Sequence, residues 1–386
     1  MPTRREFLLA PLLLTACQRE TGSRERPLFV ADAHPDGYPT VEALYAIDRI
    51  LAERTGGEMR VRVYSGGQLG SEADTLEITI FGGLDLNRVN LAPLNSIVPA
   101  TAVLALPFLF RSVAHSRAAF DGAPGRVILD ALEPHGLKGL CYYDSGARSF
   151  YNTRRPIHTP GDMRGLKVRV QNSNIYVAMV QALGANPTPI PYSEVFQALV
   201  QGVVDCAENN WPSYESSRHF EVARHYSLTQ HVMAPEVLVA SLRSWEKLDD
   251  DQRAHLQAAA DASVPIMREL WDARVEASRR RVLDDGIEVV EEIDHTAFAA
   301  RMRPMWERFL AAPGLRDLVE EIEALDPAAD SRPAGDPGTR PERERSSQPA
   351  EARSAGCREG ADGVARGTGS YGELFSASGR PTGAAS

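Results

Sequence analysis

The chain is 386 residues long, and its 42 Lys and Arg against 52 Asp and Glu give a net charge of −10 at pH 7. This length allows two or three domains with a sizeable core in each, and the acidic balance disfavours nucleic acid as a partner because its phosphates would be repelled. The four cysteines form no C-x-x-C pair and have no histidine at zinc spacing, so we expect neither a disulfide framework nor a metal site.

The first seventeen residues have the features of an export signal. Arg4 and Arg5 precede an apolar run over residues 7–14, which is too short to cross a bilayer of about 30 Å. The arginine pair resembles the twin-arginine signal, and Leu14–Cys17 resembles a bacterial lipobox, in which Cys17 would be acylated. A plain secretory signal with an incidental cysteine is the alternative. We expect a periplasmic lipoprotein anchored to the cytoplasmic membrane and exported by the Sec or the twin-arginine route.

Between residues 28 and 324, strand-like runs alternate with amphipathic helical stretches, which is typical of α/β domains with mostly parallel sheets. A polar tether over residues 18–27 precedes this region, and we place a boundary between two intertwined lobes near residue 150. In chain order we expect strand 28–33, helix 40–54, strand 59–64, helix 71–81, strand 103–110, helix 116–132, strand 139–143, strand 166–170, helix 175–183, strand 187–190, helix 193–201 and strand 202–205.

Two later segments break this alternation. Residues 249–285 carry apolar side chains at helical spacing with no glycine and one proline, Pro265, so we expect one long helix that could brace both lobes from behind. Residues 327–386 contain 10 Gly and 6 Pro and almost no large apolar side chains. Such a segment cannot bury enough surface to offset its chain entropy, so we expect a disordered tail.

The sequence contains no convincing catalytic signature. None of the nine histidines lies in an H-E-x-x-H pattern, and Ser145 lacks the leading glycine of a nucleophile elbow. Glu208 has no second carboxylate marked as its partner, and the G-x-G-x-x-G at residues 367–372 lies in the tail with no strand before it. We therefore expect a binding protein without a cofactor, and a periplasmic hydrolase is the alternative from another class.

Two arginines stand beside apolar, strand-like segments: Arg148 within residues 146–152 and Arg169 within residues 165–172. A guanidinium binds a carboxylate through two parallel hydrogen bonds, so two arginines facing one cleft would hold a small organic acid. The alternative for each arginine is an internal salt bridge.

Asn209 and Trp211 follow the strand expected at residues 202–205 and would lie at its carboxyl end, where open α/β sheets bind ligands. Asparagine can bond hydroxyl groups, and Trp211 or Tyr192 offers a flat face to a sugar ring. The alternative is a simple turn with Trp211 in the core.

Several of these segments together resemble the periplasmic solute-binding proteins of TRAP (tripartite ATP-independent periplasmic) transporters, of the DctP type. The resemblance covers residues 28–324 and implies two α/β lobes that close on a ligand around a hinge and share a long helix, with a membrane permease as partner. The segments that carry it are 31–35, 67–72, 106–110, 146–152, 165–172, 191–199 and 205–210.

The resemblance also assigns roles to individual residues. The carboxylate-clamping arginine of the family falls on Arg169 and a second arginine on Arg148, its conformation-reading asparagine on Asn209 and its aromatic lid on Tyr192. The other expected ligand contacts are Glu72, Asn172, His34 and Trp211. The stretches around His34 and Trp211 look like the branch of the family that takes sugar acids, so we expect a hexuronate or an aldonate. A 2-oxo or dicarboxylic acid is the alternative.

Overall fold

The computed structural model describes residues 26–326, so the expectations for the export signal, Cys17 and the tail lie outside the described residues. Within that range the strands form two separate sheets. No helix in this part of the chain combines the length and the apolar character that a membrane span requires.

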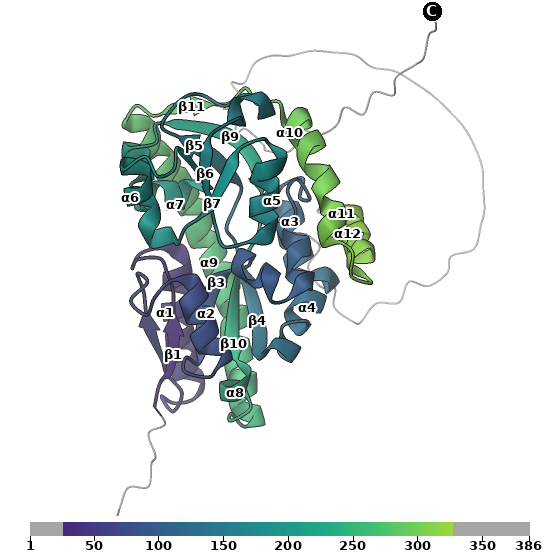
Figure 1. Ribbon diagram of the computed structural model, residues 1–386. Coiled ribbons are helices and arrows are strands. Elements are labelled where there is room, and N and C mark those ends of the chain that lie inside the picture. The colour runs from purple at the N-terminus through teal and green to yellow at the C-terminus, as the bar shows by residue number, and fades with distance from the viewer. Residues whose placement is uncertain (1–25, 327–386) are drawn as a thin grey trace, which may run out of the picture.

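Lobe 1 is built on the five-stranded sheet, in the order β2-β1-β3-β10-β4. Its strands are β1 (Leu28–Ala31), β2 (Val61–Tyr64), β3 (Leu86–Asn90), β4 (Leu137–Tyr143) and β10 (Glu236–Ser241). Its helices are α1 (Pro39–Arg54), α2 (Glu72–Ile80), α3 (Val113–Asp121), α4 (Ala123–Asp130) and α8 (Leu242–Trp245). Figure 1 shows this lobe in the lower half of the molecule.

Lobe 2 is built on the six-stranded sheet, in the order β11-β9-β5-β8-β6-β7. Its strands are β5 (Arg148–Asn152), β6 (Lys167–Val170), β7 (Asn186–Pro189), β8 (Cys206–Asn209), β9 (His225–Val232) and β11 (Glu288–Val290). Its helices are α5 (Asn174–Ala182), α6 (Val195–Val200) and α7 (Trp211–Ser216). The chain passes into this lobe between Tyr143 and Arg148 and returns to lobe 1 between Val232 and Glu236.

The long helix is confirmed as α9 (Asp250–Asp284), which begins at a capping box of Asp249 and Gln252 and continues through Pro265. One buried stripe along it includes Leu256, Ala260, Met267 and Trp271, as expected for a helix with one face against the core. It packs on α1 and β4 of lobe 1 and on α7 of lobe 2, so one rigid element connects the two lobes (Figure 1).

A second connection is made by the last helices, α10 (His295–Met302), α11 (Trp306–Phe309) and α12 (Leu315–Ala324). α10 contacts α5 and β9 of lobe 2, while α12 contacts α4 of lobe 1. Figure 1 shows this run of helices along one side of the molecule.

Three expected elements differ from the structure. Residues 103–110 are not a strand: a 3-10 helix covers Pro99–Ala105, and Phe108 has a φ of 59°, which no strand allows. The strand expected at 202–205 begins at Cys206, because Gly202 forms a left-handed turn. The helix expected at 116–132 is divided at Gly122 into α3 and α4.

The sheets are also mixed rather than mostly parallel. β10 runs antiparallel to both β3 and β4, and β5 runs antiparallel to both β8 and β9. β5 and β10 are the first strands after the two crossings between lobes. A parallel pair needs a connection that returns the chain to the other end of the same sheet, usually through a helix. A chain that crosses directly into the other sheet makes no such return.

Candidate ligand-binding site

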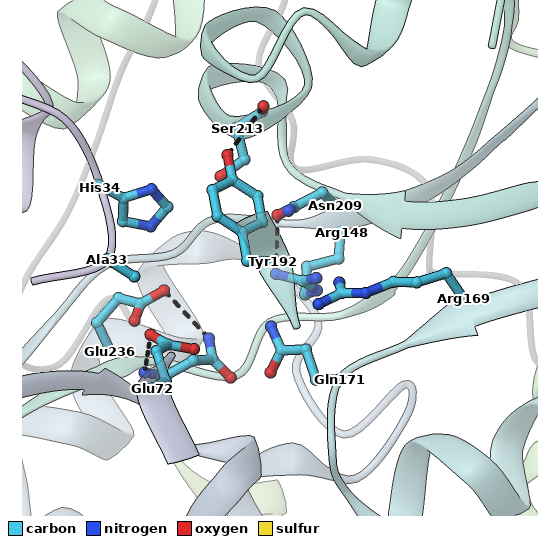
Figure 2. A pocket seen from close by; sticks show the side chains of 11 residues that line it. Ala33, His34, Glu72, Arg148, Arg169, Gln171, Tyr192, Asn209, Ser213 and Glu236 are labelled. Carbon is cyan, nitrogen blue, oxygen red and sulfur yellow. Dashed lines mark hydrogen bonds between the residues drawn. The ribbon is translucent and has the colours of Figure 1, made fainter. Parts of the chain in front are cut away.

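A small cavity lies between the lobes and is lined by side chains from both (Figure 2). Its volume is about 20 Å³, room for about one water molecule. A larger cleft of about 820 Å³ adjoins it, and the two share Ala33, Glu72, Arg169, Gln171 and Tyr192. Lobe 1 contributes Ala33, His34, Glu72, Asn90 and Glu236, and lobe 2 contributes Arg148, Arg169, Gln171, Tyr192, Asn209 and Ser213. The ligand site expected from the sequence and this cavity therefore share six residues: His34, Glu72, Arg148, Arg169, Tyr192 and Asn209.

Arg169, on β6, is buried with 2% of its surface exposed. Its Nε donates to the Ile190 carbonyl oxygen at 2.8 Å, and no acidic side chain within residues 26–326 forms an ion pair with it. Figure 2 shows its guanidinium directed into the cavity. Burial lowers the pKa of Arg169 and outweighs the opposing effect of the nearby Glu208 carboxylate, while Arg148 lowers it further. A buried cation without a counter-ion is costly, so this position favours an anionic ligand.

Arg148, the first residue of β5, has the opposite environment because its charge is already balanced. Its Nε and Nη2 donate to Glu208 Oε2 and Oε1 at 2.5 and 2.8 Å, and its Nη1 donates to Asn209 Oδ1 at 2.8 Å. Burial raises the pKa of Glu208, but the Arg148 guanidinium outweighs this and lowers the pKa to about 2. Arg148 therefore forms the internal salt bridge that was the alternative for both arginines, and its partner stays ionised.

The lobe 1 side of the cavity carries an acidic cluster that the sequence did not reveal. It is organised around Arg88 of β3, which is 0% exposed. Arg88 Nη1 donates to Glu72 Oε1 at 2.9 Å and to Glu236 Oε2 at 2.6 Å. Its Nε donates to Asp32 Oδ2 at 2.8 Å. Three carboxylates thus surround one guanidinium, and the wall opposite Arg169 carries excess negative charge.

Two further side chains of the cavity have buried atoms without a hydrogen-bond partner: His34 Nδ1 and Gln171 Oε1. Burial lowers the pKa of His34 well below its usual range, as do Arg88 and Arg148, so the ring is neutral at pH 7. Unpaired polar atoms in a buried site favour a ligand that supplies the missing hydrogen bonds.

Two of the expected contacts lie elsewhere. Asn172 lines the adjoining cleft rather than the small cavity. Trp211 lines neither: its ring stacks on Tyr226 with centroids 4.1 Å apart, and the two belong to a hydrophobic cluster of lobe 2. The structure thus places Trp211 in the core, the alternative given for it. Sequence reasoning in turn missed Ala33, Asn90, Gln171, Ser213 and Glu236.

Contacts across the cavity join the lobes directly. His34 stacks on Tyr38 with centroids 3.8 Å apart and presents its edge to Tyr192 of lobe 2 at 5.2 Å. The Tyr38 hydroxyl lies 2.9 Å from Ser213 Oγ of lobe 2, in a buried hydrogen bond. These contacts can form only when the lobes are together, so they favour the closed arrangement.

Replacing Tyr38 by phenylalanine is expected to weaken ligand binding about three- to tenfold, because closure would lose one buried hydrogen bond of about 1 kcal/mol. Calorimetric titration of the variant measures this. Tyr45→Phe is the matched control, since the Tyr45 hydroxyl bonds Asp36 within lobe 1 on the exposed surface. Equal affinities of the two variants would show that the Tyr38–Ser213 bond does not contribute to closure.

Residues 30–312 of this chain match the sequence model of a protein family, the bacterial extracellular solute-binding proteins, family 7 (DctP). The chain belongs to this family. A solute-binding protein of Chromohalobacter salexigens is 43% identical over 291 residues, which are 75% of this chain and 87% of the relative. The C4-dicarboxylate-binding periplasmic protein of Rhodobacter capsulatus is 30% identical over 281 residues, 72% of this chain and 82% of that protein.

Solved structures of TRAP periplasmic solute-binding proteins have the same fold. The protein of a Bradyrhizobium species, in complex with galacturonate, is 50% identical and superposes with a TM-score of 0.76, covering 77% of this chain and 99% of its own. The protein of Chromohalobacter salexigens, with bound D-glucuronate, is 42% identical with a TM-score of 0.75 and the same coverage of both chains. The expected two-lobed fold and the resemblance to the TRAP family are both confirmed.

Proposed function

We propose that this family 7 protein captures a hexuronate such as glucuronate or galacturonate outside the cytoplasm and delivers it, chemically unchanged, to a TRAP membrane permease. The observation that carries the proposal is Arg169, a buried guanidinium directed into a cavity between two lobes and without an ion pair in the described chain. The ligands of the Bradyrhizobium and Chromohalobacter structures support the choice of a hexuronate over an aldonate or a 2-oxo acid.

In this proposal the ligand carboxylate pairs with Arg169 through two parallel hydrogen bonds. The sugar hydroxyls then reach the acceptors of the opposite wall, Glu72 and Glu236, and the unpaired atoms of His34 and Gln171. Because these contacts come from both lobes, each lobe alone binds weakly and the ligand stabilises the closed arrangement.

The test is a screen of sugar acids by thermal shift, followed by calorimetry. We expect D-glucuronate or D-galacturonate to raise the melting temperature, and NMR to recover the same sugar acid after prolonged incubation. A chemically altered sugar would indicate an enzyme, and the absence of any shift with every sugar acid would contradict the proposal.

The membrane anchor is proposed from the sequence of the lipobox, since Cys17 lies outside the described residues. We expect Cys17→Ser to move the protein from the membrane fraction to the soluble periplasmic fraction or to block its processing, because a lipid at this cysteine would be lost. Mass spectrometry of the native N-terminus provides the direct measurement. An unmodified N-terminus downstream of Cys17 would exclude the anchor.

A further inference from the structure

The charges around the cavity are distributed unevenly between its walls. On lobe 2, Arg148 is neutralised by Glu208, so Arg169 is the cation left over. On lobe 1, Asp32, Glu72 and Glu236 face the single guanidinium of Arg88, which leaves excess negative charge there. The site can therefore bind one anionic group beside Arg169, and it repels a second one beside Glu72 and Glu236.

We infer that Glu72 and Glu236 act as a charge filter that restricts the site to acids with one carboxylate. This rests on the proposed hexuronate function and deepens it by excluding the hexarates, which carry carboxylates at both ends, as well as smaller dicarboxylates. The distinction matters because the family includes a relative that binds C4-dicarboxylates.

Hydrogen bonds hold the side chains of Glu72 and Glu236 in place, so neither can move away easily from a second carboxylate of a ligand. Glu72 Oε1 accepts from Arg88 Nη1 and also from the Asn90 backbone N–H at 3.0 Å, while Glu236 Oε1 accepts from Asn90 Nδ2 at 3.1 Å. Arg88 and Asn90 thus hold both carboxylates in place. Figure 2 shows their carboxylates beside one another at the edge of the cavity.

The two ends of a hexuronate differ in charge, because only one of them carries a carboxylate. With its carboxylate on Arg169, the sugar would present hydroxyl groups to the acidic wall, and a hydroxyl can donate a hydrogen bond to a carboxylate. A hexarate would present a second carboxylate, which cannot donate when ionised. Two like charges about 4 Å apart near a protein surface repel strongly enough to lower affinity by at least about 100-fold.

The unpaired buried atoms in the same cavity, His34 Nδ1 and Gln171 Oε1, independently indicate that a polar group of the ligand lies between the walls. A hydroxylated ligand satisfies them whether it is a hexuronate or a hexarate. Hydrogen bonding alone therefore does not separate these two classes, and the charge of the wall does.

The decisive experiment compares hexuronates with hexarates by calorimetry, using the wild type, Glu72→Gln and Glu194→Gln. The glutamine at position 72 can still accept from Arg88 and Asn90, and Asp32 and Glu236 still balance Arg88, so this variant is expected to fold. Glu194→Gln is the matched control, because it removes the same charge from the adjoining cleft instead of the cavity.

We expect the wild type and the control to bind hexuronate at least about 100-fold more tightly than the corresponding hexarate. In Glu72→Gln the hexarate should gain at least about tenfold in affinity while the hexuronate gains nothing, because only the hexarate is relieved of repulsion. Equal binding of both acids by the wild type, or no gain of hexarate affinity in the variant, overturns the filter. Wild type that binds neither acid overturns the proposed function itself.

A pH series provides a second readout. Burial raises the pKa of Glu72 in spite of Arg88, and the charges of Glu236 and Asp32 raise it further. The Glu72 side chain also accepts a hydrogen bond from Asn90, and Arg169 faces it across the cavity. The raised pKa brings protonation of Glu72 to a higher pH than in an ordinary glutamate, and the ligand carboxylates stay ionised down to about pH 5. Hexarate binding should therefore improve as the pH falls toward about 5. This trend should be absent in Glu72→Gln, and its persistence there would contradict the assignment to Glu72.

Discussion

Replacement of Arg169 by lysine is expected to lower hexuronate affinity by about 100-fold or more. A lysine keeps the positive charge but loses the planar fork that holds both carboxylate oxygens at once. It also loses the bond from Nε to the Ile190 carbonyl oxygen, which orients the guanidinium toward the cavity. The carboxylate would then be held by one mobile point charge instead of two fixed donors.

Calorimetry of Arg169→Lys with glucuronate and galacturonate measures this effect. Arg154→Lys is the matched control in the same lobe, because Arg154 is exposed and pairs with Asp205 away from the cavity. The control should bind as the wild type does. If Arg169→Lys bound these hexuronates with a dissociation constant within about threefold of the wild type, the assignment of Arg169 as the carboxylate clamp would be wrong.

Replacement of Glu208 by glutamine is expected to cost about 3 kcal/mol of folding free energy at pH 7, because Arg148 would be left buried without its counter-charge. The ordinary pKa of glutamate is near 4.5, and in the folded protein the pKa of Glu208 is about 2. A depressed pKa stabilises the folded state above the ordinary value and loses that contribution as the pH falls toward the folded value. The difference between wild type and variant should therefore shrink between pH 4.5 and pH 2.

Urea unfolding of both proteins across that pH range measures the difference directly. Glu215→Gln is the matched control, since Glu215 pairs with Arg274 at 2.6 Å in a partly exposed position, where the loss should be below about 1 kcal/mol. If Glu208→Gln were as stable as the wild type at pH 7, Arg148 would need another counter-charge, and its role as a neutralised arginine would be wrong.

The sequence predicts best what is local and periodic. Helix α9 could be read from its own residues because a long apolar stripe without glycine has few alternatives. Residues 103–110 were misread because a fully buried apolar run lacks the alternation that separates a strand from a buried helix. Phe108 adopts its positive φ for tertiary reasons, with its N–H bonded to the carbonyl of His231.

The site shows a similar division. Arg148 and Arg169 carry equivalent signals in the sequence, yet one is neutralised and one is not. The difference depends on Glu208, which is 60 positions from Arg148 and meets it only through pairing of β5 with β8. Arg88 was missed because β3 was not predicted, and its partner Glu236 is 148 positions away.

Strand β10 also determines when lobe 1 can form during synthesis. Residues 236–241 lie between β3 and β4, so a nascent chain that ends before them holds β2-β1-β3 and β4 as two pieces without their central strand. Ribosomes release the N-terminal part of a chain first, and separable domains often fold in that order. Here the strands of the first lobe must wait until nearly all of the second has emerged. The export machinery therefore meets either an incompletely folded precursor or one in which both lobes have folded together.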